Sequence, residues 1–558
     1  MKTISNSQRG MALIMVIMIT MILLTVTGAG LLFSGLNHRT ASSYQKTSQV
    51  LYAAETGAES AAAQIITLFN TVLLPTPSNL ATITPPTVSG YTFPAFTVAP
   101  VGGQVQQEIA AGVYAGLTAY ITNYQITSTA TQTGTTNSAA VVLEVQDYLI
   151  PLFQFGVFYQ DDLEMLPGPN MTFTGGRIHS NNDIYVGANA TFSIDAKMST
   201  AQNVYNRRKD TGAAALMPGT VQIKDSLGGY QAMKQGGVVL DSGDPTLFPD
   251  PYVLDPLTEK NANWAGDSQT RWGGNVKSTD HGIQSLNLPL PATNSPVDII
   301  QRGDAGDSQA LKDARYYWTA GLRIIDGAAF DKNGVGVTLP AGALTSRTFW
   351  DYREQKTVEA HELDVNALGS AGTTWNGIVY ISKTQSGGDL DAVRLVNGSS
   401  LPTGGLTVAS DNPVYIKGNY NTANGPAAII GDAVTILSSS WNDAWNAGTP
   451  LDSRIPTATT VKGAIMTGNV PTSGPDYSGG VENLPRFLEK WTGVTLTYSG
   501  SLVDLWSSQR ATGDWKYGGS VYTAPNRNWS YGISLANMPP GTPRVRLVQK
   551  VRWKQLLN

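Results

Sequence analysis

Hydrophobic side chains fill the start of the chain, and no charged residue occurs between Met11 and Leu36. A helix of about 26 apolar residues, rising about 1.5 Å per residue, is long enough to cross a bilayer. Lys2 and Arg9 both precede this run. Because positive charges favour the cytoplasmic side, the remainder of the chain is expected to be exported. The pattern therefore predicts a single-pass anchor in the inner membrane.

Beyond the apolar run the pattern becomes amphipathic. Small and apolar side chains recur at steps of three and four, which is the spacing that lines one face of a helix. These positions are Leu51, Ala54, Ala58, Ala61, Ile65 and Leu68. Pro75 and Pro77 then end the pattern. We expect one long helix over residues 11–73, with one half in a membrane or filament core and the other half against a globular part.

Residues 74–150 predict a small β region. The linker 74–90 is rich in Pro, Thr and Ser, and it is followed by runs of β-branched and aromatic residues over 91–98, 113–128 and 139–148. A turn at 133–137 separates the last two runs. Three antiparallel strands behind a long helix would give a pilin-like head.

From residue 151 the chain reads as many short alternating strands separated by Gly, Asn and Asp turns. Short strands of this kind often wind as a solenoid in which each strand stacks on its equivalent in the next coil. We therefore expect 151–558 to form a right-handed parallel β-helix or a similar solenoid, with a β-sandwich as the alternative. Pro-rich loops suggest an insertion around 200–370. The fold class is α+β.

Composition supports an extracellular β-rich protein. Only 14% of residues are charged, while 58 are Gly and 30 are Pro. The chain has no Cys, which excludes disulfides and thiolate metal sites. The formal net charge of −4 gives no broad attraction toward nucleic acid, so no nucleic-acid partner is expected.

The junction of Gly10 with Met11, Ala12, Leu13 and Ile14 resembles the leader of type IV pilins and pseudopilins. The resemblance implies that residues 1–10 are a leader, that prepilin peptidase cuts between Gly10 and Met11, and that Met11 is then N-methylated. Most major pilins have Glu at the fifth mature position, where this chain has Met15. That carboxylate pairs with a neighbour's N-terminus during assembly, so the departure speaks against a bulk subunit.

A second matching segment follows the apolar run. Ala53, Ala54, Glu55, Gly57 and Glu59 are similar to the "AAEAGxE" box of the PilX-like N-terminal family of minor pilus-assembly proteins, and K-type minor pseudopilins share the opening at Gly10. Segments within 151–545 look like the large C-terminal domain often fused to PilX-like N-termini. The resemblance implies a minor pilin that acts in pilus assembly, in initiation or in tip adhesion. Its implied partners are prepilin peptidase, other minor and major pilins, the inner membrane before assembly and an unknown surface ligand.

Candidate chemistry is sparse, and we expect no enzymatic activity, cofactor or metal. The sequence contains no phosphate loop, zinc helix or nucleophile elbow. Two Gly-Asp-Ser segments contain Ser268 and Ser308, but neither has the expected His partner in sequence. His361, Glu362 and Asp364 offer metal-ligating atoms, although alternate positions of this kind are usually solvated. Asp331 begins a calcium-like loop that lacks its closing Glu.

Paired acids leave one enzymatic alternative open. Asp161, Asp162 and Glu164 form one group, and Asp389 with Asp391 forms another. Because some β-helix proteins cleave polysaccharides with paired carboxylates, a membrane-anchored surface carbohydrate-active enzyme is an alternative function. A K-type minor pseudopilin of a secretion system is the other alternative.

Overall fold

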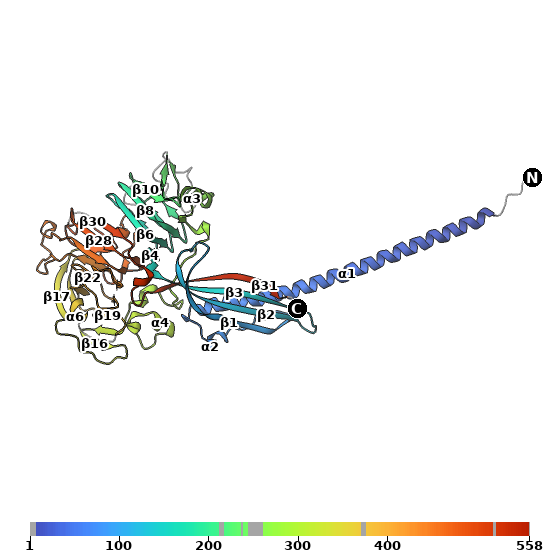
Figure 1. Ribbon diagram of the computed structural model, residues 1–558, viewed down its shortest axis with the longest axis horizontal. Coiled ribbons are helices and arrows are strands. Elements are labelled where there is room, and N and C mark those ends of the chain that lie inside the picture. Colours follow the sequence, from blue (N-terminus) through green and yellow to red (C-terminus); the bar gives the residue numbers. More distant parts are fainter. Residues whose placement is uncertain are drawn as a thin grey trace, which may run out of the picture.

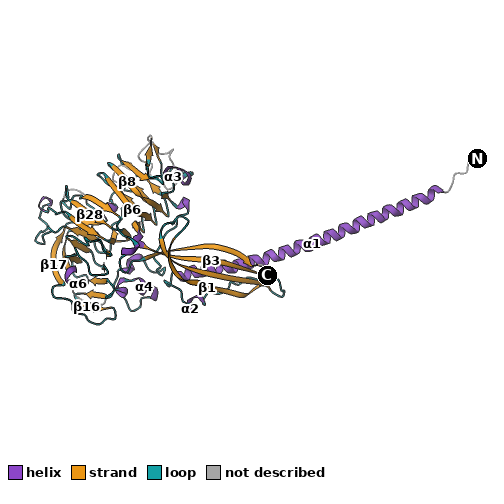
Figure 2. Cartoon of the chain, in the orientation of Figure 1, coloured by secondary structure: helices purple, strands orange, loops and turns teal. Residues whose placement is uncertain are grey.

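The computed structural model describes residues 7–210, 217–235, 238–243, 260–369, 375–516 and 520–556. One long helix, α1 (Ser7–Phe69), projects from a β-rich body and ends at the chain's first sheet (Figure 1). Strands make up most of that body, with short helices at its edges (Figure 2). The architecture is therefore α+β, with a long N-terminal helix followed by a large sheet-rich region.

The C-terminal half of α1 lies on a four-stranded antiparallel sheet in the order β1-β2-β3-β31. Its strands are β1 (Tyr91–Glu108), β2 (Thr118–Gln132), β3 (Ser138–Pro151) and β31 (Arg544–Leu556). A four-residue helix, α2 (Pro77–Leu80), links α1 to β1 and is capped by the Thr76 side chain. We call α1 and this sheet the helix–sheet module. The three strands expected within 91–148 are present; β1 and β3 are longer than their sequence patterns indicated, and β2 lies about four residues further along the chain.

The rest of the chain, residues 152–543, forms a β-solenoid that we call the head. Its main wall is a 13-stranded sheet that runs from β11 to β16, with β14 paired to β8 off the main path. In spatial order the strands are β11 (Tyr230–Ala232), β10 (Thr220–Lys224), β8 (Thr191–Thr200), β6 (Met171–Ser180), β4 (Phe155–Tyr159), β29 (Leu502–Ser507), β26 (Ala464–Asn469), β23 (Ala427–Gly431), β21 (Leu406–Ala409), β19 (Ile378–Ser382), β15 (Leu322–Ile325) and β16 (Ala328–Asp331); β14 is Val276–Lys277. Most neighbouring strands run parallel, as in a solenoid and unlike a β-sandwich.

Smaller sheets form the other walls. A six-stranded sheet contains β17 (Leu344–Asp351), β18 (Lys356–Asp364), β20 (Leu390–Val396), β22 (Val414–Lys417), β24 (Val434–Leu437) and β27 (Pro485–Phe487). Two three-stranded sheets contain β25 (Thr459–Lys462), β28 (Thr495–Ser499) and β30 (Asn526–Ser530), and β5 (Leu163–Met165), β7 (Ile184–Val186) and β9 (Val204–Tyr205). A short hairpin pairs β12 (Lys234–Gln235) with β13 (Val238–Val239).

The first strand of the main wall along the chain, β4, lies in the middle of the wall. The chain starts at β4 and extends one side of the wall through β6, β8 and β10. It then crosses to the opposite end and returns through β19, β21, β23 and β26 to β29, where Asp504 pairs with Tyr159 of β4. The two halves of the solenoid therefore meet at a seam between β4 and β29.

Three apolar clusters hold these parts together. One fills the solenoid interior, and another lies between α1 and its sheet. The third covers the outer face of the main wall and joins residues of the helix–sheet module, such as Ile121 and Leu547, to head residues such as Tyr380. Short helices lie along the chain near these clusters: α3 (Trp264–Trp272), α4 (Gln309–Ala314), α5 (Tyr316–Thr319) and α6 (Val365–Gly369). The shared cluster fixes the head to the module.

The boundaries between the domains differ from those that the sequence pattern predicts. The helix ends at Phe69, earlier than the expected residue 73. Residues 544–556 return to the helix–sheet module, although we had placed them in the 151–558 domain. Within the expected insertion at 200–370, β10 and β15–β18 belong to the solenoid walls, so the described segment outside the walls is mainly 260–320. The insertion also contains residues outside the described ranges. Sequence periodicity reveals strands but not their partners, which explains these differences.

Candidate functional site: the exposed helix and its seat

The N-terminal half of α1 contacts no other described part of the chain. Met11, Leu13, Ile14 and Met15 are between 59% and 70% exposed, and Ala12 is also exposed. Thr20, Thr25 and Thr27 of this half do not need external partners, because each hydroxyl donates to a carbonyl one turn earlier; the Thr20 hydroxyl donates to Val16 O at 2.8 Å. A surface of this kind suits a lipid or protein environment.

The expected processing site lies within this exposed half. The helix runs through Gly10 and Met11 without interruption, and a Cβ atom built on Gly10 would meet nothing within 4 Å. Residues 1–6 of the expected leader lie outside the described residues. The structure also places Met15 on the exposed helix, where it presents a thioether and no charge. Cleavage after Gly10 stays a prediction.

The family box forms the seat of the helix on the sheet. Ala53, Ala54 and Gly57 are buried against the sheet, Glu55 is half-buried, and Glu59 is exposed. A Cβ atom on Gly57 would lie 2.2 Å from Ser128 Oγ and 2.6 Å from Phe93 Cε1. Only glycine therefore permits this close approach of α1 to β2 and β1.

Two basic residues of the C-terminal strand bind the same helix. Lys550 forms an exposed ion pair with Glu59 of the box. Arg546 is buried and donates to the carbonyl oxygens of Phe69 and Leu73 at the helix end. The last carbonyls of a helix have no partner within the helix, so the guanidinium supplies the missing donors and its charge suits the negative end of the helix dipole. Sequence analysis missed Arg546, because no local pattern links it to residue 69.

Asp147 completes this arrangement. Its Oδ1 accepts from Arg546 Nε at 2.8 Å, and its side chain is fully buried. Burial raises the pKa of Asp147, while the adjacent guanidinium favours the charged form. The β3–β31 pair and the helix end therefore form one unit.

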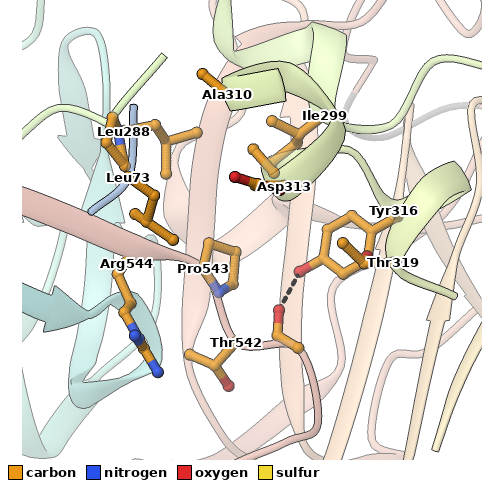
Figure 3. A pocket seen from close by; sticks show the side chains of 13 residues that line it. Leu73, Leu288, Ile299, Ala310, Asp313, Tyr316, Thr319, Thr542, Pro543 and Arg544 are labelled. Carbon is orange, nitrogen blue, oxygen red and sulfur yellow. Dashed lines mark hydrogen bonds between the residues drawn. The ribbon is translucent and has the colours of Figure 1, made fainter. Parts of the chain in front are cut away.

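A cavity lies where the module meets the head (Figure 3). It has a volume of about 250 Å³ and is lined by residues from the chain just after α1, from 288–319 and from 541–544. The Tyr316 hydroxyl donates to Gly541 O at 2.9 Å across one side. Arg544 also belongs to the lining, and its guanidinium stacks over the Tyr120 ring, 3.9 Å from the ring centroid. Among the described buried side chains of this lining, no polar atom lacks a partner. The cavity offers space with little to orient a ligand.

The expected acids at 161–164 share a narrow crevice near the seam. The crevice measures about 40 Å³, far below the roughly 300–1,000 Å³ typical of ligand sites. Asp162 pairs with Lys209 at 2.7 Å, and Glu164 accepts from Ser478 Oγ at 2.8 Å. Burial raises the pKa of both Asp161 and Glu164. The crevice is too small for a sugar ring in this conformation.

The second acidic pair is not a site. Asp391 is fully buried, pairs with Lys383 and accepts from the Ser386 backbone N–H at 2.6 Å. Asp389 is exposed in the turn before β20. The structure thus assigns Asp391 to holding a loop and does not bring the two carboxylates together in a cavity.

One Gly-Asp-Ser segment does meet a histidine. Ser268 Oγ lies 2.7 Å from His281 Nε2. However, His281 Nδ1 accepts the backbone N–H of Ser278 at 3.0 Å, so in the neutral ring Nε2 carries the proton and donates to Ser268. A ring in this state cannot take the proton of Ser268, whose side chain is also fully buried. The pair is a structural hydrogen bond.

The other candidate groups hold turns and strands. Ser308 caps α4 by accepting from Leu311 N at 3.3 Å, and Asp331 accepts from Val335 N at 2.9 Å within a turn. Glu362 accepts from Arg394 at 2.7 Å. Within the described ranges, no group of three or more His, Asp or Glu side chains is placed to hold a metal ion.

Comparisons with known proteins add little. No protein-family model matches the chain, and no curated protein matches it. Among solved structures, it is similar to the competence-associated pilin ComZ from Thermus thermophilus. The identity is 11%, the match covers 92% of this chain and 98% of that one, and the TM-score is 0.26. A TM-score this low supports no conclusion about fold or function.

Proposed function

We propose that the chain is a minor pilin-like component of a type IV pilus, of the PilX-like kind. The observation that carries this proposal is the division of α1. Its first half is apolar, uncharged and exposed, and its second half is seated on an antiparallel sheet. The helix can pass from the inner membrane into a filament without changing its environment, because both surround it with apolar groups.

The head favours a place at the tip or at the start of assembly. It comprises residues 152–543 inserted between β3 and β31, and it would obstruct uniform stacking of subunits along a shaft. Met15 offers no carboxylate to a neighbour's N-terminus, which also suits a subunit outside the regular shaft. Priming of assembly and adhesion are the functions that fit this position.

The proposal is tested by mass spectrometry of the N-terminal peptide in sheared surface filaments. A mature start at Met11 that requires prepilin peptidase and is recovered with filaments would support it. Gly10→Val should block processing, whereas Gly30→Val is a matched control. Both glycines are exposed in α1, and neither has a neighbour within 4 Å, so the two substitutions change the helix propensity by the same amount.

Three results would contradict the proposal. An intact Met1 start, recovery with membranes alone, or equal processing of the two variants would leave an anchored surface protein. Co-purification of the processed chain with a secretion system, and not with pili, would assign it to a pseudopilus.

A further inference from the structure

Three cationic side chains gather on the outer face of the main wall. Arg177 of β6 is paired in register with Lys197 of β8, and Lys277 of β14 is paired with Ser199, two residues along β8. Successive residues of a strand alternate between faces, so all three side chains lie on the same face. Burial and the nearby charges of Arg177 and Lys197 lower the pKa of Lys277.

Within the described residues, none of the three cations forms an ion pair with a carboxylate. Arg177 is 8% exposed and donates to two backbone carbonyls, Val113 O at 3.2 Å and Ala115 O at 2.9 Å. Asp195, on the same face, is already paired with Lys224 at 2.7 Å. Like charges on neighbouring strands of one face favour the binding of an anion beside them.

A groove of about 360 Å³ opens beside Arg177 and Lys197, within the size range of small-molecule sites. Its other walls mix polar residues such as Thr118 and Ser534 with apolar ones such as Leu117 and Ile533, together with the ring of Tyr531. That ring is fixed, since its hydroxyl donates to Phe153 O at 3.0 Å. Gly176 leaves it space, because a Cβ there would lie 2.8 Å from Tyr531 Cγ.

We infer that this groove binds a uronate sugar, with its carboxylate at Arg177 and Lys197 and its ring near Tyr531, while Lys277 adds positive charge from outside the groove lining. Hydroxyl and backbone groups along the groove match the many hydroxyls of a sugar. A nucleic acid fits less well, because it requires an extended basic surface, whereas this chain carries a net charge of −4 and the cluster is small. The inference does not depend on whether the chain enters a filament.

The test is a calorimetric titration of the full-length chain in non-ionic detergent. Hexagalacturonate should bind, and its uncharged methyl ester and the neutral hexasaccharide maltohexaose should not. Lys197→Ala should weaken binding about fivefold, as expected for an exposed charge pair, and Lys277→Ala should weaken it less, because Lys277 lies outside the groove lining. Lys332→Ala is the matched control, because Lys332 is exposed in the turn after β16, at the opposite end of the main wall. Arg177 is left intact, since it also holds two carbonyls.

A titration with free galacturonate distinguishes a site for a single sugar from a site for a polysaccharide. Equal affinity for free galacturonate would assign the site to a single sugar, and tighter binding of the hexamer would assign it to an acidic polysaccharide. The inference is overturned if hexagalacturonate does not bind, if maltohexaose binds equally, or if the double variant Lys197→Glu/Lys277→Glu binds as the parent does. It is also overturned if a short DNA duplex binds more tightly and loses affinity in the same variants.

Discussion

Arg546 Nε lies 2.8 Å from Asp147 Oδ1 of β3, and the same guanidinium donates to Phe69 O, so Arg546 joins the last strand of the chain to the end of its first helix. Both side chains are almost completely buried. The C-terminal strand is therefore part of the N-terminal module. A buried pair of this kind is sensitive to the loss of either partner, because the remaining charge is left without compensation.

Replacing Arg546 with Met should destabilise the helix–sheet module by about 3–5 kcal/mol. Asp147 would lose its partner, and the helix end would lose its donors. Hydrogen exchange of residues 50–69, followed by mass spectrometry, measures the effect. Lys550→Met is the control, since its exposed pair with Glu59 is expected to contribute at most about 1 kcal/mol. Equal exchange in the two variants would show that Arg546 does not hold the helix.

Enlarging Gly57 should lift the helix from its seat. The added Cβ of Gly57→Ala would overlap Ser128 Oγ and Phe93, at a cost of about 1–3 kcal/mol. Gly28→Ala has no neighbour within 4 Å and should be neutral or slightly stabilising. Thermal unfolding monitored through the exchange of residues 50–69 compares the two. The seat described here is disproved if both variants unfold at the same temperature.

The head should lose stability as the pH rises from about 4.5 to 7. Burial raises the pKa of Glu489 to about 7, although Ser438 donates to both of its oxygens. When the pKa of a carboxyl group is higher in the folded state than in the unfolded state, the group stabilises the fold fully below its unfolded pKa. This stabilisation is lost as the pH rises through the folded-state pKa. Glu489→Gln should flatten this slope in melting curves between pH 5 and 8. A slope that persists unchanged would exclude Glu489 as its source.

His179, in contrast to Glu489, should make the head less stable as the pH falls. Burial lowers the pKa of its ring to about 3, and the neutral ring contacts Ser199 Oγ at 3.0 Å and Asn181 Oδ1 at 3.1 Å. Its contribution is complete above the unfolded pKa of about 6.5 and is lost as the pH falls toward 3. His179→Gln, if it folds, should reduce the acid-induced drop in melting temperature. An identical acid transition in the variant would contradict this assignment.

Local sequence patterns predicted the elements better than their partners. The apolar run and the Ala54–Ala58–Ala61 face predicted α1, and alternation predicted the short solenoid strands. Residues 544–556 also alternate, but nothing local indicates that they pair with β3, because pairing depends on contacts distant in sequence.

The same holds for the candidate sites: contiguous motifs could be found in the sequence, whereas residues that only the fold brings together could not. The Gly57 box was found because it is a contiguous motif that faces one surface. The cluster of Arg177, Lys197 and Lys277 was not found, since its members are separated along the chain and meet only through strand register. The acids at 161–164 are adjacent in sequence, yet the fold gives them a crevice with almost no space.

The seam between β4 and β29 can form only late in the synthesis of the chain. Until residues near 504 have emerged, β4 has no neighbour on one side, and its backbone groups there remain unpaired. Unpaired strand edges recruit other strands, and contacts between distant residues form slowly. Nearly the whole chain must therefore be synthesised before the solenoid can close, so the head passes through an open stage in which the free edge of β4 can pair with other strands.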